Sequence, residues 1–342
     1  MDNLTHSLCA LTLAQTPLKR AGRGTTLTLL LASNAPDSDI VVAIARGGEA
    51  YLSAHRGSSH GPLGILTLAV IVATLIYVAR RRGRPPTPFF RLLGVALIGT
   101  LSHVLMDVPT SYGTRLFSPF TSTWYAVDLM PIIDVYLLGL LAIGLIAGRL
   151  IVAFRGQVAV AVLVLMGVNY AFRTVVHAMA LGRAGGNRTH IVSSWPDAPR
   201  PKLPSDYSCR AEPCTLEIAA IPTFVSPFSW RIIRQMSNGY DIREMDLRAG
   251  AERPIAWLPN DSAPAVQAAR QESAPRSFLA FSRFPTARVR THDDETVVRI
   301  LDVRFLDSPL GEGDEELRGG GLFGVRVRID RHGRILDDRL GN

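Results

Sequence analysis

The chain has 342 residues, of which 47% are hydrophobic and only 19% are charged, which excludes intrinsic disorder and is more apolar than a typical soluble enzyme. The net charge of +8 would fit a nucleic-acid-binding protein if the basic residues formed one patch. Instead, the first 189 residues hold 16 Lys and Arg against 7 Asp and Glu, whereas the remainder holds 21 against 22, so nucleic acid is not an expected partner.

Apolar segments predict a helical membrane bundle in the first half of the chain. Two short segments come first, at 4–18 and 25–35. Fifteen helical residues reach only about 22 Å, less than the ~30 Å of hydrocarbon in a bilayer. Four longer segments approach the ~20 residues that a membrane span needs; they are 62–79, 92–106, 131–148 and 158–181. We therefore expect about four transmembrane spans and a shorter N-terminal helical pair.

Basic residues between these segments indicate the orientation of the bundle. If the cluster at 80–84 is cytoplasmic, alternation of the segments places ten basic residues and no acidic residue on that side. These residues are Lys19, Arg20, Arg23, Arg80, Arg81, Arg82, Arg84, Arg91, Arg149 and Arg155. Three crossings follow the cluster, so we predict a multi-pass membrane protein whose C-terminal part lies outside the cytoplasm.

The composition changes after residue 182. A Gly- and Pro-rich linker is expected at 183–204, and alternating apolar and polar residues beyond it predict half-buried strands. The predicted strands are 215–221, 230–236, 240–247, 297–305 and 322–329, with a short helix at 263–270. The predicted organisation is a membrane-embedded domain at 1–182, the linker, and a β-rich extramembrane domain at 205–342. Cys209 and Cys214 would lie in an oxidising compartment, where a disulfide is expected and two free thiols are the alternative.

Ionisable residues gather where the apolar segments reach the outer face, although such groups are costly at membrane depth. His103 and Asp107 are four residues apart, so they share one face of a helix. Asp37 and Asp39 follow Pro36, which ends a helix and lets both carboxylates turn toward one site. Each pair also has an ordinary structural explanation, as a hydrogen-bonded helix pair and as an Asx turn.

Three further histidines reach the same face, with His6 opening the first helix and with His55 and His60 preceding the first long span. Each of these could be a helix cap or an interfacial loop residue, but their convergence predicts a metal site. Mixed imidazole and carboxylate ligands favour Zn²⁺, with Mn²⁺ or Fe as alternatives. The candidate ligands are His6, Asp37, Asp39, His55, His60, His103 and Asp107.

These motifs also carry a family resemblance. The run MDNLTH at 1–6, PDSD at 36–39, HRGSSH at 55–60 and HVLMDVPTSYGT at 103–114 resemble the inner-membrane-associated metal-dependent hydrolases, also called the LexA-binding hydrolase family. The resemblance covers about residues 1–182, and the tail, with Trp230-Arg231 and 281–285, looks like the C-terminal extension of longer bacterial members. The segment 59–61 reads Ser-His-Gly where the family has Thr-His-Ser, so His60 is kept while the hydrogen bonds around it are expected to change.

The first functional hypothesis is a membrane-embedded metal-dependent hydrolase that acts at the outer face on a lipid or phosphoester. Seven candidate ligands are more than one tetrahedral metal site can use, so two metals, or one metal and a base, are expected. Asp39 is the predicted general base, and Arg56 and Arg115 would stabilise an anionic transition state or bind a phosphate.

A different class of function remains open, namely a non-catalytic membrane protein with a structural metal and a regulatory or assembly role. A transporter is disfavoured because the polar residues lie at one face and form no path across the bilayer. Membrane lipids are the expected partners in each case, and the sequence does not define an oligomeric state.

Overall fold

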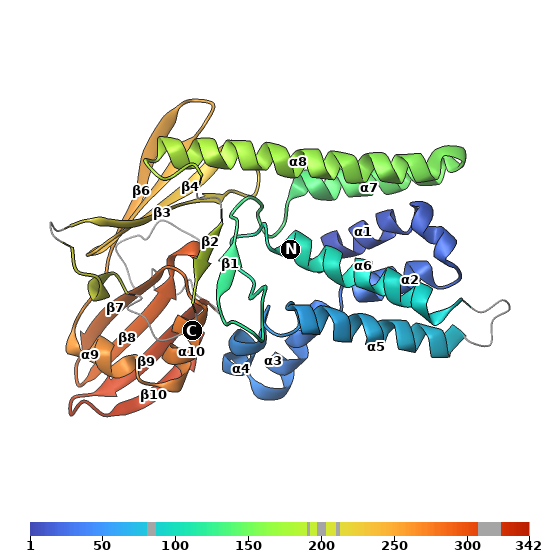
Figure 1. Cartoon of the computed structure of the whole chain (residues 1–342). Helices are drawn as coiled ribbons and strands as arrows, with labels where there is room; N and C mark the ends of the chain where they lie inside the picture. Colours follow the sequence, from blue (N-terminus) through green and yellow to red (C-terminus); the bar gives the residue numbers. More distant parts are fainter. Residues whose placement is uncertain (81–86, 190–191, 197–202, 210–212, 307–322, 342) are drawn as a thin grey trace.

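The computed structural model describes residues 1–80, 87–189, 192–196, 203–209, 213–306 and 323–341 (Figure 1). Helices occupy one end of the molecule and strands the other, and the long helix α8 runs from the first part into the second. The helical part consists of α1 (Asn3–Leu13), α2 (Thr25–Ala32), α3 (Ile40–Arg46), α4 (Gly48–Ala54), α5 (Pro62–Arg80), α6 (Phe89–Asp107), α7 (Val135–Leu150) and α8 (Arg155–Arg183), with the 3-10 turns η1 (Pro17–Ala21), η2 (Pro36–Asp39) and η3 (Val152–Phe154).

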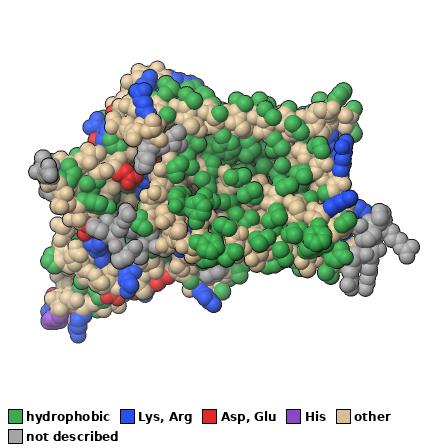
Figure 2. Space-filling view, viewed as in Figure 1, with side chains coloured by type: hydrophobic (Ala, Val, Ile, Leu, Met, Phe, Trp, Pro, Cys, Tyr) green, Lys and Arg blue, Asp and Glu red, His purple; other side chains and the backbone are tan. Residues whose placement is uncertain are grey.

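Three helical stretches of the described residues are long and apolar enough to cross a membrane: Pro62–Arg80, Phe89–Asp107 and Val152–Arg183. The predicted span at 131–148 corresponds to α7, which is apolar but has only 16 residues. Many outward side chains of these helices are apolar and exposed, including Leu75, Ile143 and Val164. Figure 2 shows a broad apolar face on the helical part of the molecule. Such a face suits contact with lipid rather than water.

The short helices α1 and α2 correspond to the predicted N-terminal pair. Ala32, at the end of α2, is followed by a bend of 48° into the segment Pro36–Arg46. Pro36 stands at the start of η2, where its fixed φ starts the turn. The helices α3 and α4 were not predicted from the sequence.

The tail contains two four-stranded antiparallel sheets, with strand orders β3-β4-β5-β6 and β10-β9-β8-β7. Its elements are η4 (Pro204–Asp206), β3 (Thr215–Pro222), β4 (Ser229–Met236), β5 (Gly239–Asp246), β6 (Ala251–Pro259), α9 (Pro264–Ala269), α10 (Ser273–Phe281), β7 (Pro285–His292), β8 (Glu295–Asp302), η5 (Val303–Phe305), β9 (Gly324–Asp330) and β10 (Ile335–Leu340). The sequence predicted β3, β4, β5, α9, β9 and most of β8, although the first residue of the segment 322–329 lies outside the described residues. The elements β6, β7, β10 and α10 were missed.

The two parts of the molecule share a core. The strand β1 (Trp124–Ala126), in the loop after α6, pairs with β2 (Ser193–Trp195), which lies within the predicted linker. Trp124 and Trp195 stack in this ladder and pack with Phe281 of α10. The tail is therefore held directly against the loop that leaves α6.

The predicted disulfide is confirmed. Cys209 and Cys214 are bonded, with their Cα atoms 6.2 Å apart.

Candidate metal centre

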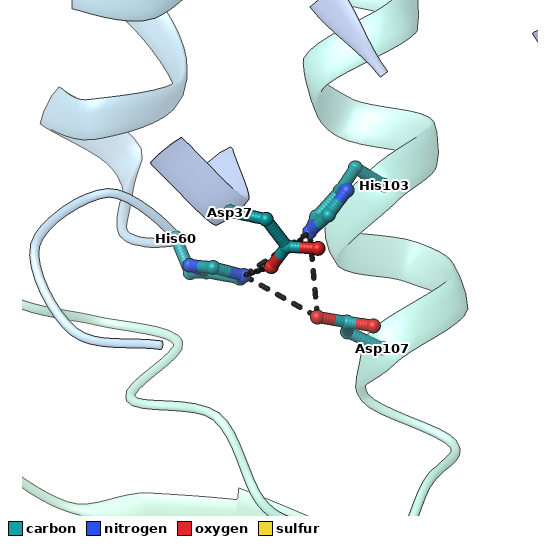
Figure 3. A group of neighbouring side chains, drawn as sticks. All are labelled: Asp37, His60, His103 and Asp107. Atoms are coloured by element: carbon teal, nitrogen blue, oxygen red, sulfur yellow. Dashed lines mark hydrogen bonds and ion pairs between the residues drawn. The ribbon is translucent and has the colours of Figure 1, made fainter. Parts of the chain in front are cut away.

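Four side chains from three separate chain segments meet at one end of the helical part: Asp37, His60, His103 and Asp107 (Figure 3). The Nε2 atoms of His60 and His103 are 3.2 Å apart. Oδ2 of Asp107 lies 3.3 Å from the first of these nitrogens and 3.4 Å from the second, and Oδ1 of Asp37 lies 3.7 and 3.4 Å from them. Both imidazoles and the Asp107 side chain are fully buried.

This spacing fits a divalent metal. In a tetrahedral zinc site with bonds of about 2.0–2.1 Å, neighbouring ligand atoms are about 3.3–3.4 Å apart. The five distances above run from 3.2 to 3.7 Å. Oδ2 of Asp107 is buried without a hydrogen-bond partner among the described residues. A buried carboxylate oxygen in that position is costly unless a cation compensates it.

The tautomers of the two histidines also favour a metal. Nδ1 of His103 lies 2.8 Å from the carbonyl oxygen of Ser33, which can only accept, so this nitrogen donates. Nδ1 of His60 lies 2.9 Å from the Ser59 hydroxyl, which in turn lies 3.3 Å from Oδ2 of Asp39 and donates to it. Both Nε2 lone pairs then face the centre, as in metal sites where an outer partner fixes the ring. Burial lowers the pKa of His60, which favours its neutral, ligand-competent form.

Close packing of two helices positions two of the candidate ligands. His103 and Asp107 are one turn apart at the end of α6, so their side chains share a face. Gly99, one turn earlier, lies against α2, where an added Cβ would stand 2.7 Å from the Cβ of Ala32. The absence of a side chain at Gly99 therefore lets α2 approach and brings the Ser33 carbonyl to His103.

The other two candidate ligands come from turns. Asp37 lies in η2, directly after Pro36. His60 lies in a turn closed by the hydrogen bond from its backbone N–H to the Gly57 carbonyl, at 3.0 Å. A Cβ at Gly61 would overlap the carbonyl oxygen of Ser118, which explains why this chain has glycine after the histidine.

Asp39 and His55 lie beside the centre rather than in it. Together with Asp37 they form a second group of possible ligand atoms, all within 4.8 Å of one another. Oδ1 of Asp39 is 3.0 Å from Nδ1 of His55, and its Oδ2 accepts from the backbone N–H of Arg56 at 3.0 Å and from the Ser59 hydroxyl. Asp39 thus ties together the loop that presents His60.

The second oxygen of Asp107 faces away from the four-atom group. Its Oδ1 lies 3.3 Å from Nε2 of His6 and 3.2 Å from Nη2 of Arg56, and it pairs with the amine of Met1. The ring of His6 stacks on that of His103, with centroids 3.9 Å apart. His6 is therefore next to the centre, on the opposite side of the shared carboxylate.

The two predicted anion-binding arginines lie in different places. Arg56 is buried within reach of Asp107, as described above, and donates to the Thr110 hydroxyl at 3.0 Å. Arg115 donates to the Ser53 carbonyl at 2.5 Å, and its guanidinium lies 4.7 Å from the ring centre of Trp124. Arg115 is thus anchored beside α4 and β1.

The tail contacts the centre indirectly, through Tyr112 in the loop after α6. This residue was not among the predicted site residues. The guanidinium of Arg56 lies 4.6 Å from the centre of this ring, and the ring packs against Phe281 and Phe305 of the tail. Arg304 donates to the backbone carbonyl of Tyr112 at 3.0 Å. The tail therefore forms the support behind Arg56.

A buried ion pair makes a second connection between the tail and the helical part. Asp128, in the loop after β1, lies 2.7 Å from Nη1 of Arg283. Burial opposes the charge on Asp128, but the guanidinium outweighs it and holds the pKa of Asp128 below its usual value. Asp134, another acid of this face, caps α7 by accepting from Leu137 N–H and pairs with Arg173 of α8. Both acids thus have structural partners.

Comparison with known proteins gives the family. Residues 1–180, more than half of the chain, match the family described as YdjM inner membrane protein, and the chain belongs to that family. Residues 264–342 match the YfhP C-terminal alpha/beta plait domain. The uncharacterized protein YfhP of Bacillus subtilis (strain 168) is 22% identical over 258 residues, which cover 65% of this chain and 76% of that protein. No solved structure matches the chain.

Proposed function

We propose that this member of the YdjM inner membrane protein family is a metal-dependent hydrolase acting on a lipid or phosphoester substrate at the outer face of the membrane. The observation that carries the proposal is the close spacing of donor atoms from Asp37, His60, His103 and Asp107, of which the last three are buried and Asp37 is half-buried. The five distances given above, from 3.2 to 3.7 Å, are near those between ligands of one tetrahedral zinc ion. Both imidazoles are already oriented by acceptors on their other nitrogens.

The donor set suits zinc best, with manganese or iron as alternatives. A metal bound here would polarise the scissile group and lower the pKa of a water toward about 7. Asp37 is the least buried of the four ligands, so its side is the approach for a substrate.

The chain's own residues would move the proton and bind the charge. Nδ1 of His55 lies 3.0 Å from Oδ1 of Asp39. We propose that the other ring nitrogen of His55 accepts the proton from water, and that Asp39, the base predicted from the sequence, acts by orienting His55 and stabilising its charged form. The guanidinium of Arg56 lies beside the centre and would bind an anionic group of the substrate. Arg115 would act from farther out, by fixing α4 and the loop that follows it.

The proposed topology has four spans and the short N-terminal pair, with the metal centre at the outer face and the tail in the periplasm. The centre and the tail lie at the end of the bundle opposite the α7–α8 turn, where Arg149 and Arg155 are located. Arg81, Arg82 and Arg84 of the predicted cytoplasmic cluster lie outside the described residues. The disulfide supports an oxidising location for the tail.

The test compares the purified full-length protein with two single variants, His103→Ala and His177→Ala. His177 is a matched control because it is also a buried histidine but lies on α8, against Trp230 of the tail. We expect the wild type to bind zinc and to cleave a phospholipid in mixed micelles. His103→Ala should reduce both metal content and turnover. Turnover should fall by at least about 100-fold, because losing only a hydrogen-bond partner of a metal ligand already costs 10–100-fold in metal affinity or activity.

Two outcomes would contradict the proposal. If the purified wild-type protein bound no metal, the proposed metal centre would be excluded. A wild type that binds zinc through His103 but cleaves neither phospholipids nor soluble phosphodiesters would favour the alternative, a structural metal in a non-catalytic protein.

A further inference from the structure

The connection between β3 and β4, residues 223–228, exposes two apolar side chains. Phe224 is 58% exposed and Val225 is 73% exposed, and we call these two residues the β3–β4 tip. The stretch from Ile218 to Trp230 contains no charged residue, although the tail as a whole is rich in acidic and basic residues. Because exposure of apolar side chains to water is unfavourable, the tip suits an apolar surrounding.

The tip lies beside helices of the bundle that face lipid. The Tyr136 hydroxyl, in the first turn of α7, donates to the Val225 carbonyl at 3.0 Å. The ring centres of Phe228, in the same connection, and of Phe172 on α8 are 5.7 Å apart. Tyr136 and Phe172 are themselves among the exposed apolar side chains of the bundle. The tip therefore continues a surface that is suited to lipid.

The length of α8 indicates where the bilayer would end. Its 29 residues extend about 44 Å, more than the ~30 Å of hydrocarbon in a bilayer. One face of its last turns, with Val176 and Ala180, packs in a core with Trp230 of β4. Figure 1 shows α8 continuing past the start of α7 to the strands of the tail. The boundary would thus lie near Phe172, which is the level at which the β3–β4 connection contacts the bundle.

The backbone of the connection is already hydrogen-bonded at the tip. The Ser226 carbonyl accepts from the Thr223 hydroxyl at 3.2 Å, and the Pro227 carbonyl accepts from Nε1 of Trp230 at 3.1 Å. Together with the Val225 carbonyl, three consecutive acceptors have partners within the protein. A backbone carbonyl without a partner is costly in hydrocarbon, so these bonds reduce the cost of placing the connection in lipid.

A second loop exposes aromatic side chains at the same end of the bundle. In the loop after α6, Phe117 is 46% exposed and Phe120 is 70% exposed. Ser118 lies against the start of α5, because a Cβ on Gly61 would overlap its carbonyl oxygen. The starts of α5 and α7 both lie at the end of the bundle that faces the tail (Figure 1). Aromatic side chains at this level are typical of contact with a membrane interface.

We propose that the β3–β4 tip inserts into the membrane leaflet on the tail side, with Phe224 and Val225 among the acyl chains. The partner is the phospholipid bilayer around α7 and α8, because the tip and these helices form one continuous apolar surface. The tail would then be held in place by the bilayer as well as by the core that it shares with Trp124. The proposal concerns the attachment of the tail and does not depend on hydrolase activity.

The test places a fluorescent probe at the tip of the full-length protein in phosphatidylcholine nanodiscs. Cys9 is buried and Cys209 is bonded to Cys214, so Val225→Cys supplies the thiol for a bimane label. Asn238→Cys is the matched control, because Asn238 is exposed in the turn at the other end of β4. The eight residues of β4, about 26 Å long, separate the two probes.

We expect the probe at Val225→Cys to emit at a shorter wavelength than the control probe. It should also lose fluorescence when the nanodiscs contain a phospholipid with a nitroxide on the acyl chain near the headgroup. The probe at Asn238→Cys should emit as it does in water and should keep its fluorescence in the same nanodiscs.

Two results would overturn the proposal. The first is emission typical of water from the probe at Val225→Cys. The second is emission at a shorter wavelength that the lipid nitroxide does not quench, because the tip would then be covered by protein, such as a second copy of the chain. Size-exclusion chromatography checks that each labelled variant is folded. If Val225→Cys does not give a monodisperse protein, Phe224→Cys is labelled in its place, with the same expected result.

Discussion

Replacing Ser59 by alanine tests the outer hydrogen bonds of the centre. The Ser59 hydroxyl is the acceptor for Nδ1 of His60 at 2.9 Å and donates to Asp39 at 3.3 Å. Its removal leaves a buried imidazole N–H without an acceptor, which costs about 1–3 kcal/mol. Loss of an outer partner typically reduces metal affinity 10–100-fold, or about 1.4–2.7 kcal/mol, so the two estimates agree. We expect Ser59→Ala to weaken zinc binding by that factor.

The assay is competition for zinc against a chelator in detergent micelles, combined with thermal unfolding with and without zinc. Weaker binding should reduce the stabilisation by zinc by the same 1.4–2.7 kcal/mol, approximately. Ser59→Thr restores a hydroxyl and should return the affinity close to that of the wild type. Ser58→Ala is the matched control, because Ser58 is the exposed neighbour. A zinc affinity for Ser59→Ala within about threefold of the wild type would refute the reasoning, since threefold is well under 1 kcal/mol.

Two further predictions concern the loop and the topology. Gly61→Ala should lower zinc affinity and stability, the latter by about 1–3 kcal/mol, because its Cβ would displace the backbone beside His60; Gly94→Ala, on α6 with nothing within 4 Å of the added Cβ, should leave zinc affinity unchanged in the same titration. An alkaline phosphatase fused after Leu340 should be active because the tail is expected in the periplasm; a fusion at that position that is active only with a cytoplasmic reporter would contradict the topology.

The parts of the centre that follow from local periodicity could be predicted from the sequence. His103 and Asp107 share a helix face because of their four-residue spacing. Pro36 was predicted to end a helix; α2 ends earlier, at Ala32, and Pro36 instead starts the turn that contains Asp37. The convergence of these segments on one face followed from alternation of the apolar segments. His60 could be predicted as a candidate ligand from its position directly before a long apolar segment.

The groups that hydrogen-bond to the candidate ligands could not be predicted, because they depend on contacts between segments that are distant in the sequence. The Ser33 carbonyl reaches His103 only where Gly99 lets two helices approach. Arg115 is near the ligands in sequence, but the fold anchors it at Ser53 and Trp124.

The missed strands have a related explanation. The strand β6 contains Pro254 and several exposed residues, so its sequence shows no clean alternation. The strand β10 carries Asp337 and Asp338 side by side, and among the described strands it lies at the edge of its sheet, next to β9. Burial of one face produces the alternation that a sequence reveals, and these edge strands have little of it.

The aromatic cluster around Trp124 has a consequence for cooperativity. Tyr112 and Trp124 from the helical part are buried in the same core as Phe278 and Phe281 from α10. Trp124 also donates to the Ala280 carbonyl at 3.1 Å. Separation of the two parts would expose these rings to water, at about 1.5–3 kcal/mol for each large side chain. The membrane bundle and the tail are thus thermodynamically coupled, and heat should melt the region between them as one unit rather than as two independent modules.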